Sequence, residues 1–270
     1  MTFLHAFILG IVQGLTEFIP VSSTAHLLIT SNLLGLPADD KTFSFSVIIQ
    51  LGTVLALLLF FWKDFWQILE AFFLGIKNKK PFENFNARMG WLVLIATVPA
   101  LIAGFFLKDI VQDRFSDPFT QGGIRLLITA VLLALVEYFD NRKRSLESAT
   151  WLDALMVGLV QVLAIFPAAS RSGSTIAGGM VRGFDRPSAA RFAFLMSAPI
   201  LLAAGVYESI QVVKMPGTHE FLPYLITGFV TAGIVGWLSI KWLMAYISKH
   251  SLYTFAIYCA VVGALVLVFR

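Results

Sequence analysis

The chain has 270 residues, of which 58% are hydrophobic and only 13% charged, and its mean hydropathy is +0.81. This composition excludes a water-soluble globular protein and is typical of an all-α polytopic membrane protein. The net charge of +4 could suggest a nucleic-acid-binding protein, but the Lys and Arg residues follow membrane topology instead, so we expect no nucleic-acid partner.

The first apolar stretch, residues 3–19, is interrupted by polar residues and runs into a Ser-rich turn rather than a charged loop. This pattern predicts a re-entrant helical hairpin, which enters and leaves the membrane on the same side. Irregular backbone at membrane depth is tolerated only where protein or a wet cavity satisfies its polar groups. We therefore expect the turn to line such a cavity.

Six further segments are long and apolar enough to cross a bilayer, which takes about 20 helical residues. They are residues 45–62, 90–107, 122–139, 189–212, 222–247 and 252–269.

Positive charge predicts the orientation of these spans. Residues 63–89 contain five Lys and Arg and residues 140–150 contain three, whereas residues 108–121 contain two. The first two connections are therefore predicted to be cytoplasmic, which places the entry of the first hairpin on the outer side of the membrane.

A second interrupted apolar stretch, residues 154–166, also ends in a Ser-rich turn, and it repeats the first. Four aligned pairs carry the repeat, at an offset of 148 residues before the prolines and 147 from them onward: Gly10 with Gly158, Gln13 with Gln161, Pro20 with Pro167, and Ser23 with Ser170. We predict a single membrane domain of two repeats, 1–147 and 148–270, each with one hairpin and three spans. Because three is odd, the second repeat enters the membrane inverted, and the two hairpin tips can meet near the midplane.

Glu17 lies in the apolar stretch of the first hairpin, where an ionised carboxylate is costly unless it is paired, solvated or metal-bound. Ionisable residues inside membranes usually face functional cavities, so we favour function over a structural hydrogen-bonding carboxylate. Gln13 lies one helical turn earlier on the same face, and the two side chains could jointly hold a cation or a water.

Arg171 of the second hairpin lies in a run of small polar residues, just before another helical stretch: Ser170, Ser172, Gly173 and Thr175. A guanidinium, hydroxyls and a helix N-terminus approached through glycine are all donors that suit phosphate oxygens. The pattern favours an anion site, although Arg171 could instead snorkel to the interface or pair with Glu17.

The turn of the first hairpin carries four residues that could supply a nucleophile and a proton-transfer group: Ser22, Ser23, Thr24 and His26. Taken alone, they would more simply be helix caps and a hydrogen-bonded histidine. Because Arg171 is expected on the opposite hairpin, we favour a catalytic role for these residues.

In these two motifs the chain resembles the undecaprenyl-diphosphate phosphatase family of bacterial membrane enzymes, which is also known for bacitracin resistance. One family motif is Glu/Gln-x-x-x-Glu leading to Pro-x-Ser-Ser-Thr-x-His, and it is matched by Gln13, Glu17, Pro20, Ser22, Ser23, Thr24 and His26. The other is Pro-Gly-x-Ser-Arg-Ser-Gly-x-Thr, and it is matched by Pro167, Ser170, Arg171, Ser172, Gly173 and Thr175. Gln13 stands where the family often has Glu, which leaves Glu17 as the only carboxylate of the first motif.

The resemblance implies hydrolysis of undecaprenyl diphosphate in the bacterial cytoplasmic (inner) membrane, with a divalent cation, Mg²⁺ or Ca²⁺, assisting. Glu17 and Gln13 would hold the cation, or Glu17 would act as a base, while Ser23 attacks and His26 moves a proton. The diphosphate would be bound by Arg171 and by a set of hydroxyls and a glycine: Ser22, Thr24, Ser170, Ser172, Gly173 and Thr175. A metal-activated water is the alternative nucleophile.

The main alternative function is a secondary transporter or lipid flippase, because inverted repeats with broken helices are typical of secondary transporters. A purely structural scaffold would leave the buried charges without a purpose. The expected partners are the polyprenyl lipid and the surrounding membrane lipids, and the oligomeric state stays open, a homodimer included.

Overall fold

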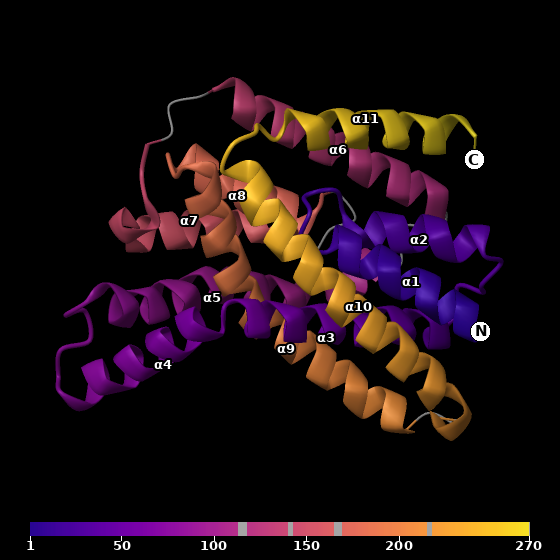
Figure 1. The fold of residues 1–270 in the computed structure, drawn as a ribbon, viewed down its shortest axis with the longest axis horizontal. Helices are drawn as coiled ribbons and strands as arrows, with labels where there is room; N and C mark the ends of the chain where they lie inside the picture. The colour runs from indigo at the N-terminus through magenta and orange to yellow at the C-terminus, as the bar shows by residue number, and fades with distance from the viewer. Residues whose placement is uncertain (113–117, 140–142, 165–168, 215–217, 270) are drawn as a thin grey trace.

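A computed structural model describes residues 1–112, 118–139, 143–164, 169–214 and 218–269. Within these ranges the regular elements are helices, in keeping with the predicted all-α class (Figure 1). In chain order they are α1 (Phe3–Thr16), α2 (Ser23–Leu33), α3 (Asp40–Phe60), α4 (Trp62–Lys77), α5 (Phe85–Gln112), α6 (Pro118–Tyr138), the short 3₁₀ helix η1 (Leu146–Ser148), α7 (Trp151–Val162), α8 (Arg171–Val181), α9 (Arg186–Lys214), α10 (Thr218–Ile247) and α11 (Tyr253–Val268).

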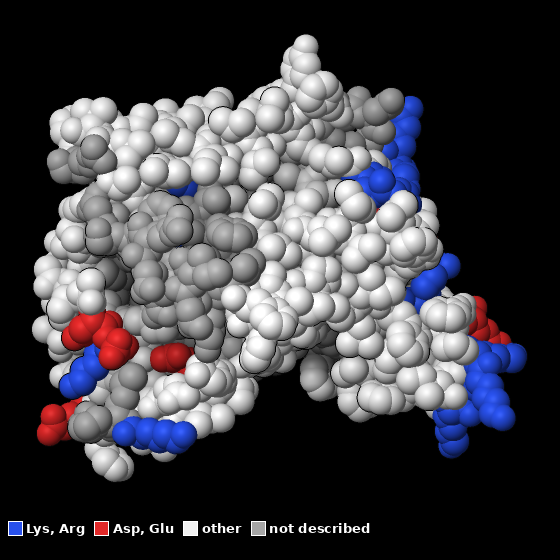
Figure 2. Space-filling view, turned by 180° about the vertical axis from the view of Figure 1, so that it is seen from behind, with Lys and Arg blue, Asp and Glu red and all other residues white. Residues whose placement is uncertain are grey.

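Five of the described helices, α3, α5, α6, α9 and α10, are long and apolar enough to cross a membrane. They coincide with five of the six predicted spans. The sixth corresponds to α11, whose 16 residues give a length of about 24 Å at the helical rise. In Figure 2 the charged side chains gather towards the two ends of the long axis, and the described surface between them is largely uncharged. This distribution suits a multi-pass membrane protein.

The two predicted hairpins correspond to pairs of short helices, α1 with α2 and α7 with α8. A turn over residues 17–22 separates α1 from α2, and the two helices pack against each other, as do α7 and α8. Figure 1 shows α2 beside α1 on the side of the N-terminus, whereas α7 lies on the opposite side of the molecule, where it packs against α5.

Two repeat-related glycines allow the hairpin helices to approach long helices closely. A Cβ atom on Gly10 of α1 would lie 2.8 Å from the carbonyl oxygen of Gly228 on α10. On Gly158 of α7 it would lie 2.5 Å from the carbonyl oxygen of Ala96 on α5. Real Cβ atoms do not come this close. Only glycine, whose side chain is a hydrogen atom, therefore allows the helices to pack at this separation.

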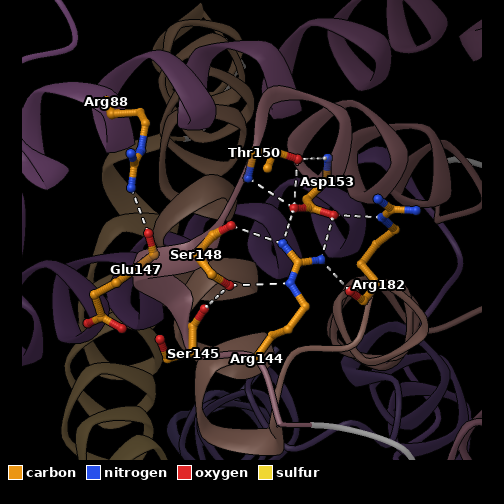
Figure 3. A network of polar contacts seen from close by, with 8 residues as sticks. All are labelled: Arg88, Arg144, Ser145, Glu147, Ser148, Thr150, Asp153 and Arg182. Carbon is orange, nitrogen blue, oxygen red and sulfur yellow. Dashed lines mark hydrogen bonds and ion pairs between the residues drawn. The ribbon is translucent and has the colours of Figure 1, made fainter.

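A buried carboxylate ties the start of α7 to the end of α8 (Figure 3). Asp153 accepts hydrogen bonds from the guanidinium groups of Arg144 and Arg182, each at 2.7 Å, and it forms a capping box with Thr150. Arg144 also donates to the carbonyl oxygen of Arg182 at 2.7 Å. The hydrogen bond to Asp153 raises the pKa of Arg144, so the network keeps its charges and anchors the second hairpin.

Candidate active site

The two hairpin tips meet at the carboxylate of Glu17, which is 2% exposed and accepts four hydrogen bonds. The donors to Oε2 are Gln13 Nε2 and Ser23 Oγ, both at 2.7 Å, and the donors to Oε1 are Gln50 Nε2 at 3.1 Å and a terminal guanidinium nitrogen of Arg171. Arg171 belongs to the second hairpin, 154 residues away in sequence. These four donors make an ionised carboxylate tolerable in an otherwise apolar bundle.

Local backbone geometry places Ser23 beside this carboxylate. Glu17 is the C-cap of α1, and the chain turns back so that Ser22 caps the N-terminus of α2, its hydroxyl accepting from the backbone N–H of Ala25 at 3.4 Å. Ser22 has φ of +69°, a left-handed conformation that costs a non-glycine residue about 1 kcal/mol or more. The tight turn brings the Ser23 hydroxyl, six residues from Glu17, within hydrogen-bond distance of it.

The second tip is the N-terminus of α8. Ser170 is its N-cap, with the hydroxyl accepting from the N–H of Gly173 at 3.2 Å, and the N–H of Ser170 donates to Thr129 Oγ1 on α6 at 3.1 Å. The hydroxyls of Ser170 and Ser172 lie 3.2 Å apart. The first N–H groups of a helix have no partner within the helix, so both α2 and α8 present donors that suit an anion.

Both helix N-termini open onto one cavity of about 460 Å³. Its polar lining comes from α2, α3, α6, α7, α8 and the end of α1, and it includes Glu17, Ser22, Ser23, Thr24, Gln50, Arg125, Gln161, Ser170, Arg171 and Ser172. Its apolar walls come from α5, at Ala100 to Phe105, and from α9, at Ile200 to Ala204. A neighbouring cavity of about 550 Å³, beside the connection between α2 and α3, shares Ser23, Thr24 and Gln50 with it. The expectation that the hairpin turns line a cavity is therefore met.

Not every predicted site residue faces the cavity. His26 Nδ1 lies 2.9 Å from the carbonyl oxygen of Ser22, and Nε2 lies 2.9 Å from the hydroxyl of Tyr258 on α11. The Thr175 hydroxyl donates to the carbonyl oxygen of Arg171 at 2.8 Å, within α8. Neither of these residues lines the cavity, nor does Gly173, and the proton-transfer role of His26 stays a prediction.

Three polar residues of the cavity were not singled out as functional from the sequence: Gln50, Arg125 and Gln161. Gln50 and Arg125 are strongly polar residues inside predicted apolar spans, which is the signal that could have found them. Gln161 was recognised only as the repeat partner of Gln13.

The residues present fit a divalent cation only in part. Among the described residues, no group of three or more His, Cys, Asp and Glu could hold a metal ion. Glu17 is the one carboxylate among the described residues that line the cavity, which suffices for Mg²⁺ when substrate phosphates supply further ligands. Gln13 donates its amide N–H to Glu17, so it would ligate a cation only with the amide turned round.

Comparison with known proteins finds relatives over nearly the whole chain. Residues 6–265 match the family model described as "Bacitracin resistance protein BacA". The chain is 38% identical to the undecaprenyl-diphosphatase of Chloroherpeton thalassium, with 99% of this chain and 96% of that protein covered. It is 40% identical to undecaprenyl-diphosphatase 1 of Corynebacterium jeikeium, covering 99% and 94%, and 39% identical to the undecaprenyl-diphosphatase of Myxococcus xanthus, covering 99% and 89%.

Proposed function

The chain belongs to the bacitracin resistance protein BacA family, and on that premise we propose that it is a membrane phosphatase acting on undecaprenyl diphosphate. It hydrolyses this lipid to undecaprenyl phosphate and inorganic phosphate, which returns the lipid carrier to peptidoglycan synthesis. The observation that carries the proposal is the hydrogen bond from Ser23 to Glu17 beside Arg171, in a cavity onto which two helix N-termini open.

Arg171 binds the terminal phosphate of the substrate. One of its terminal nitrogens is paired with Glu17, while the other, Nη1, is buried without a hydrogen-bond partner among the described residues. A phosphate oxygen would satisfy that nitrogen with a charge-assisted hydrogen bond. The hydroxyls of Ser170 and Ser172 and the free N–H groups at the starts of α2 and α8 add further donors.

Ser23 attacks the terminal phosphorus, and Glu17 takes the proton of its hydroxyl. The bond between the terminal phosphorus and the bridging oxygen breaks, and its electron pair leaves with undecaprenyl phosphate. A water then hydrolyses the phosphoserine, releasing inorganic phosphate and restoring the hydroxyl. Direct attack by a water held at Glu17 is the alternative, and a trapped phosphoserine distinguishes the two.

A divalent cation, Mg²⁺ or Ca²⁺, belongs to the proposal, held by Glu17 together with phosphate oxygens of the substrate. When bound it supplies positive charge that neutralises the diphosphate. Glu17 therefore has two tasks. It orients the Ser23 hydroxyl and takes its proton, and it would hold the cation beside the phosphates.

The arrangement in the membrane is also part of the proposal. Two inverted repeats, residues 1–147 and 148–270, each contain a re-entrant hairpin and three spans, and the cavity opens to the outer side of the bacterial inner membrane. The Lys and Arg content of residues 63–89 and 140–150 supports this orientation. The apolar walls from α5 and α9 would accept the prenyl chain.

Phosphate release from farnesyl diphosphate in detergent tests the reaction class, with and without EDTA. The wild-type protein should release phosphate and lose this activity with EDTA, and Glu17→Ala and Arg171→Ala should be inactive. Arg88→Ala, at a half-buried arginine that does not line the cavity, is the matched control and should remain active. A transporter or flippase would release no phosphate in any variant.

A further inference from the structure

The cavity holds a positive charge that the proposed mechanism does not use. Three charged residues line it, Glu17, Arg125 and Arg171, and the first and last of these form an ion pair. Arg125 lies on α6, inside a membrane-spanning helix, and its Nε atom is buried without a hydrogen-bond partner. Its guanidinium makes no hydrogen bond or ion pair with any part of the chain that the structure describes. An uncompensated cation at this depth indicates an anionic ligand.

A second side chain of the cavity is also unpaired. Gln161 on α7 is 2% exposed, and neither its amide oxygen nor its amide nitrogen has a partner among the described residues. Its repeat partner, Gln13, uses its amide nitrogen on Glu17 and Thr53. A buried amide that lines a cavity without partners is available to a ligand, because buried polar groups are otherwise almost always hydrogen-bonded.

Arg125 lies close to the proposed site of the terminal phosphate. It precedes Thr129 by one turn of α6, a rise of about 5.4 Å to 6 Å, and Thr129 accepts the hydrogen bond from the N–H of Ser170 at the start of α8. Arg125 and Arg171 therefore face one cavity from neighbouring helices. A diphosphate, which has two charged groups, matches two guanidinium groups better than a single phosphate does.

We propose that Arg125 and Gln161 form a second phosphate subsite, which binds the phosphate that stays on the lipid. The inference rests on the proposed function, because it divides the diphosphate between two ends of one cavity. The reacting phosphorus must lie next to Ser23, at the Arg171 end. The phosphate attached to the prenyl chain then lies at Arg125, where it gains negative charge as the bridging bond breaks.

The two subsites can be separated by measuring the binding of the two products without turnover. Farnesyl phosphate should occupy the Arg125 subsite, and inorganic phosphate should occupy the Arg171 subsite. Equilibrium binding of each is measured in detergent for the wild-type protein, Arg125→Gln and Gln161→Leu. We expect Arg125→Gln to weaken farnesyl phosphate about tenfold or more and to change inorganic phosphate less than about twofold, since a bidentate charge-assisted contact is lost at one subsite only. Arg125→Lys, which keeps the charge, should recover part of the affinity.

Gln161→Leu separates a ligand role from a structural one. Because it removes an unpaired buried amide, it should leave the thermal unfolding temperature unchanged or raise it, while farnesyl phosphate binds several-fold more weakly. Equal weakening of both products in Arg125→Gln, or unchanged binding of farnesyl phosphate in both variants, would overturn the second subsite. Phosphate release by the wild-type protein is scored separately, so a failure of the proposed reaction is distinguishable from a failure of this inference.

Discussion

The hydroxyl of Ser23 lies 2.7 Å from Oε2 of Glu17, and the other carboxylate oxygen of Glu17 pairs with Arg171. One carboxylate therefore connects the residue that would attack phosphorus to the residue that would hold the phosphate. The contact joins the two hairpins, so this unit exists only when both halves of the chain are folded together.

Replacing Ser23 tests whether the hydroxyl is the nucleophile. Ser23→Ala should lower kcat by about 1,000-fold or more, because Ser23 is the hydroxyl that donates to the proposed base, Glu17. Acid quenching of the wild-type protein during turnover should trap a phosphoryl group on Ser23, detected by mass spectrometry of the peptide. Ser209→Ala, which removes a hydroxyl bonded within α9, should be fully active. Activity of Ser23→Ala within about tenfold of wild type would instead favour direct attack by water.

Breaking the pair between Glu17 and Arg171 should destabilise the protein as well as inactivate it. The side chains are 1% and 18% exposed, and removing one partner of such a pair typically costs about 3 to 5 kcal/mol, because the other charge is left unpaired. Glu17→Gln and Arg171→Gln should each lower the thermal unfolding temperature in detergent. The double variant should be more stable than the sum of the two losses predicts, and simple additivity would contradict a direct coupling.

The sequence predicts the meeting of Glu17 and Arg171 better than it predicts the rest of the cavity. The sequence repeat relates the two motifs, and the predicted inversion of the second copy places their tips together. In contrast, Gln50 and Arg125 lie in apolar helices outside the two motifs, where the sequence does not show which way a polar side chain faces. The contact of His26 with Tyr258 joins residues 232 positions apart, and no spacing or motif indicates it.

The sequence likewise predicts some of the helices and misses others. Hydropathy predicts α3, α5, α6, α9 and α10 because each contains a long apolar run. Helix α4 was treated as part of a connection, since charged residues at its two ends, such as Lys63 and Lys77, interrupt the apolar pattern. It packs against α5, and several of its large apolar side chains, such as Trp66 and Phe73, stay exposed.

The close approach of α7 to α5 predicts that even one methyl group at Gly158 is harmful. Gly158→Ala should lower stability by about 1 to 3 kcal/mol, because the added Cβ would overlap the backbone of Ala96. Gly178→Ala is the matched control: its Cβ would meet Val160 at 3.4 Å, an ordinary contact, and alanine is the better helix former. Thermal unfolding of the two variants should therefore move in opposite directions, and equal shifts would exclude close packing as the reason.

The Asp153 network should matter for folding and not for chemistry. Asp153→Asn would leave Arg144 and Arg182 without their buried carboxylate, at a cost of about 3 kcal/mol. The folded fraction should retain wild-type kcat, because none of these residues lines the cavity. Glu83→Gln, which breaks the exposed pair with Lys80, should change neither stability nor activity. A specific activity of Asp153→Asn far below wild type would show that the second hairpin transmits strain to the site.

Cysteine labelling tests the orientation of the site. Ala38 is exposed in the connection between α2 and α3, next to the second cavity, and Asn78 is exposed between α4 and α5. The one native cysteine, Cys259, is fully buried and should not react with the maleimide. In intact cells an impermeant maleimide should label Ala38→Cys, whereas Asn78→Cys should react only after permeabilisation, because the Lys and Arg residues around it favour the cytoplasm. The reverse pattern would move the entrance of the second cavity, and with it phosphate release, to the cytoplasmic side.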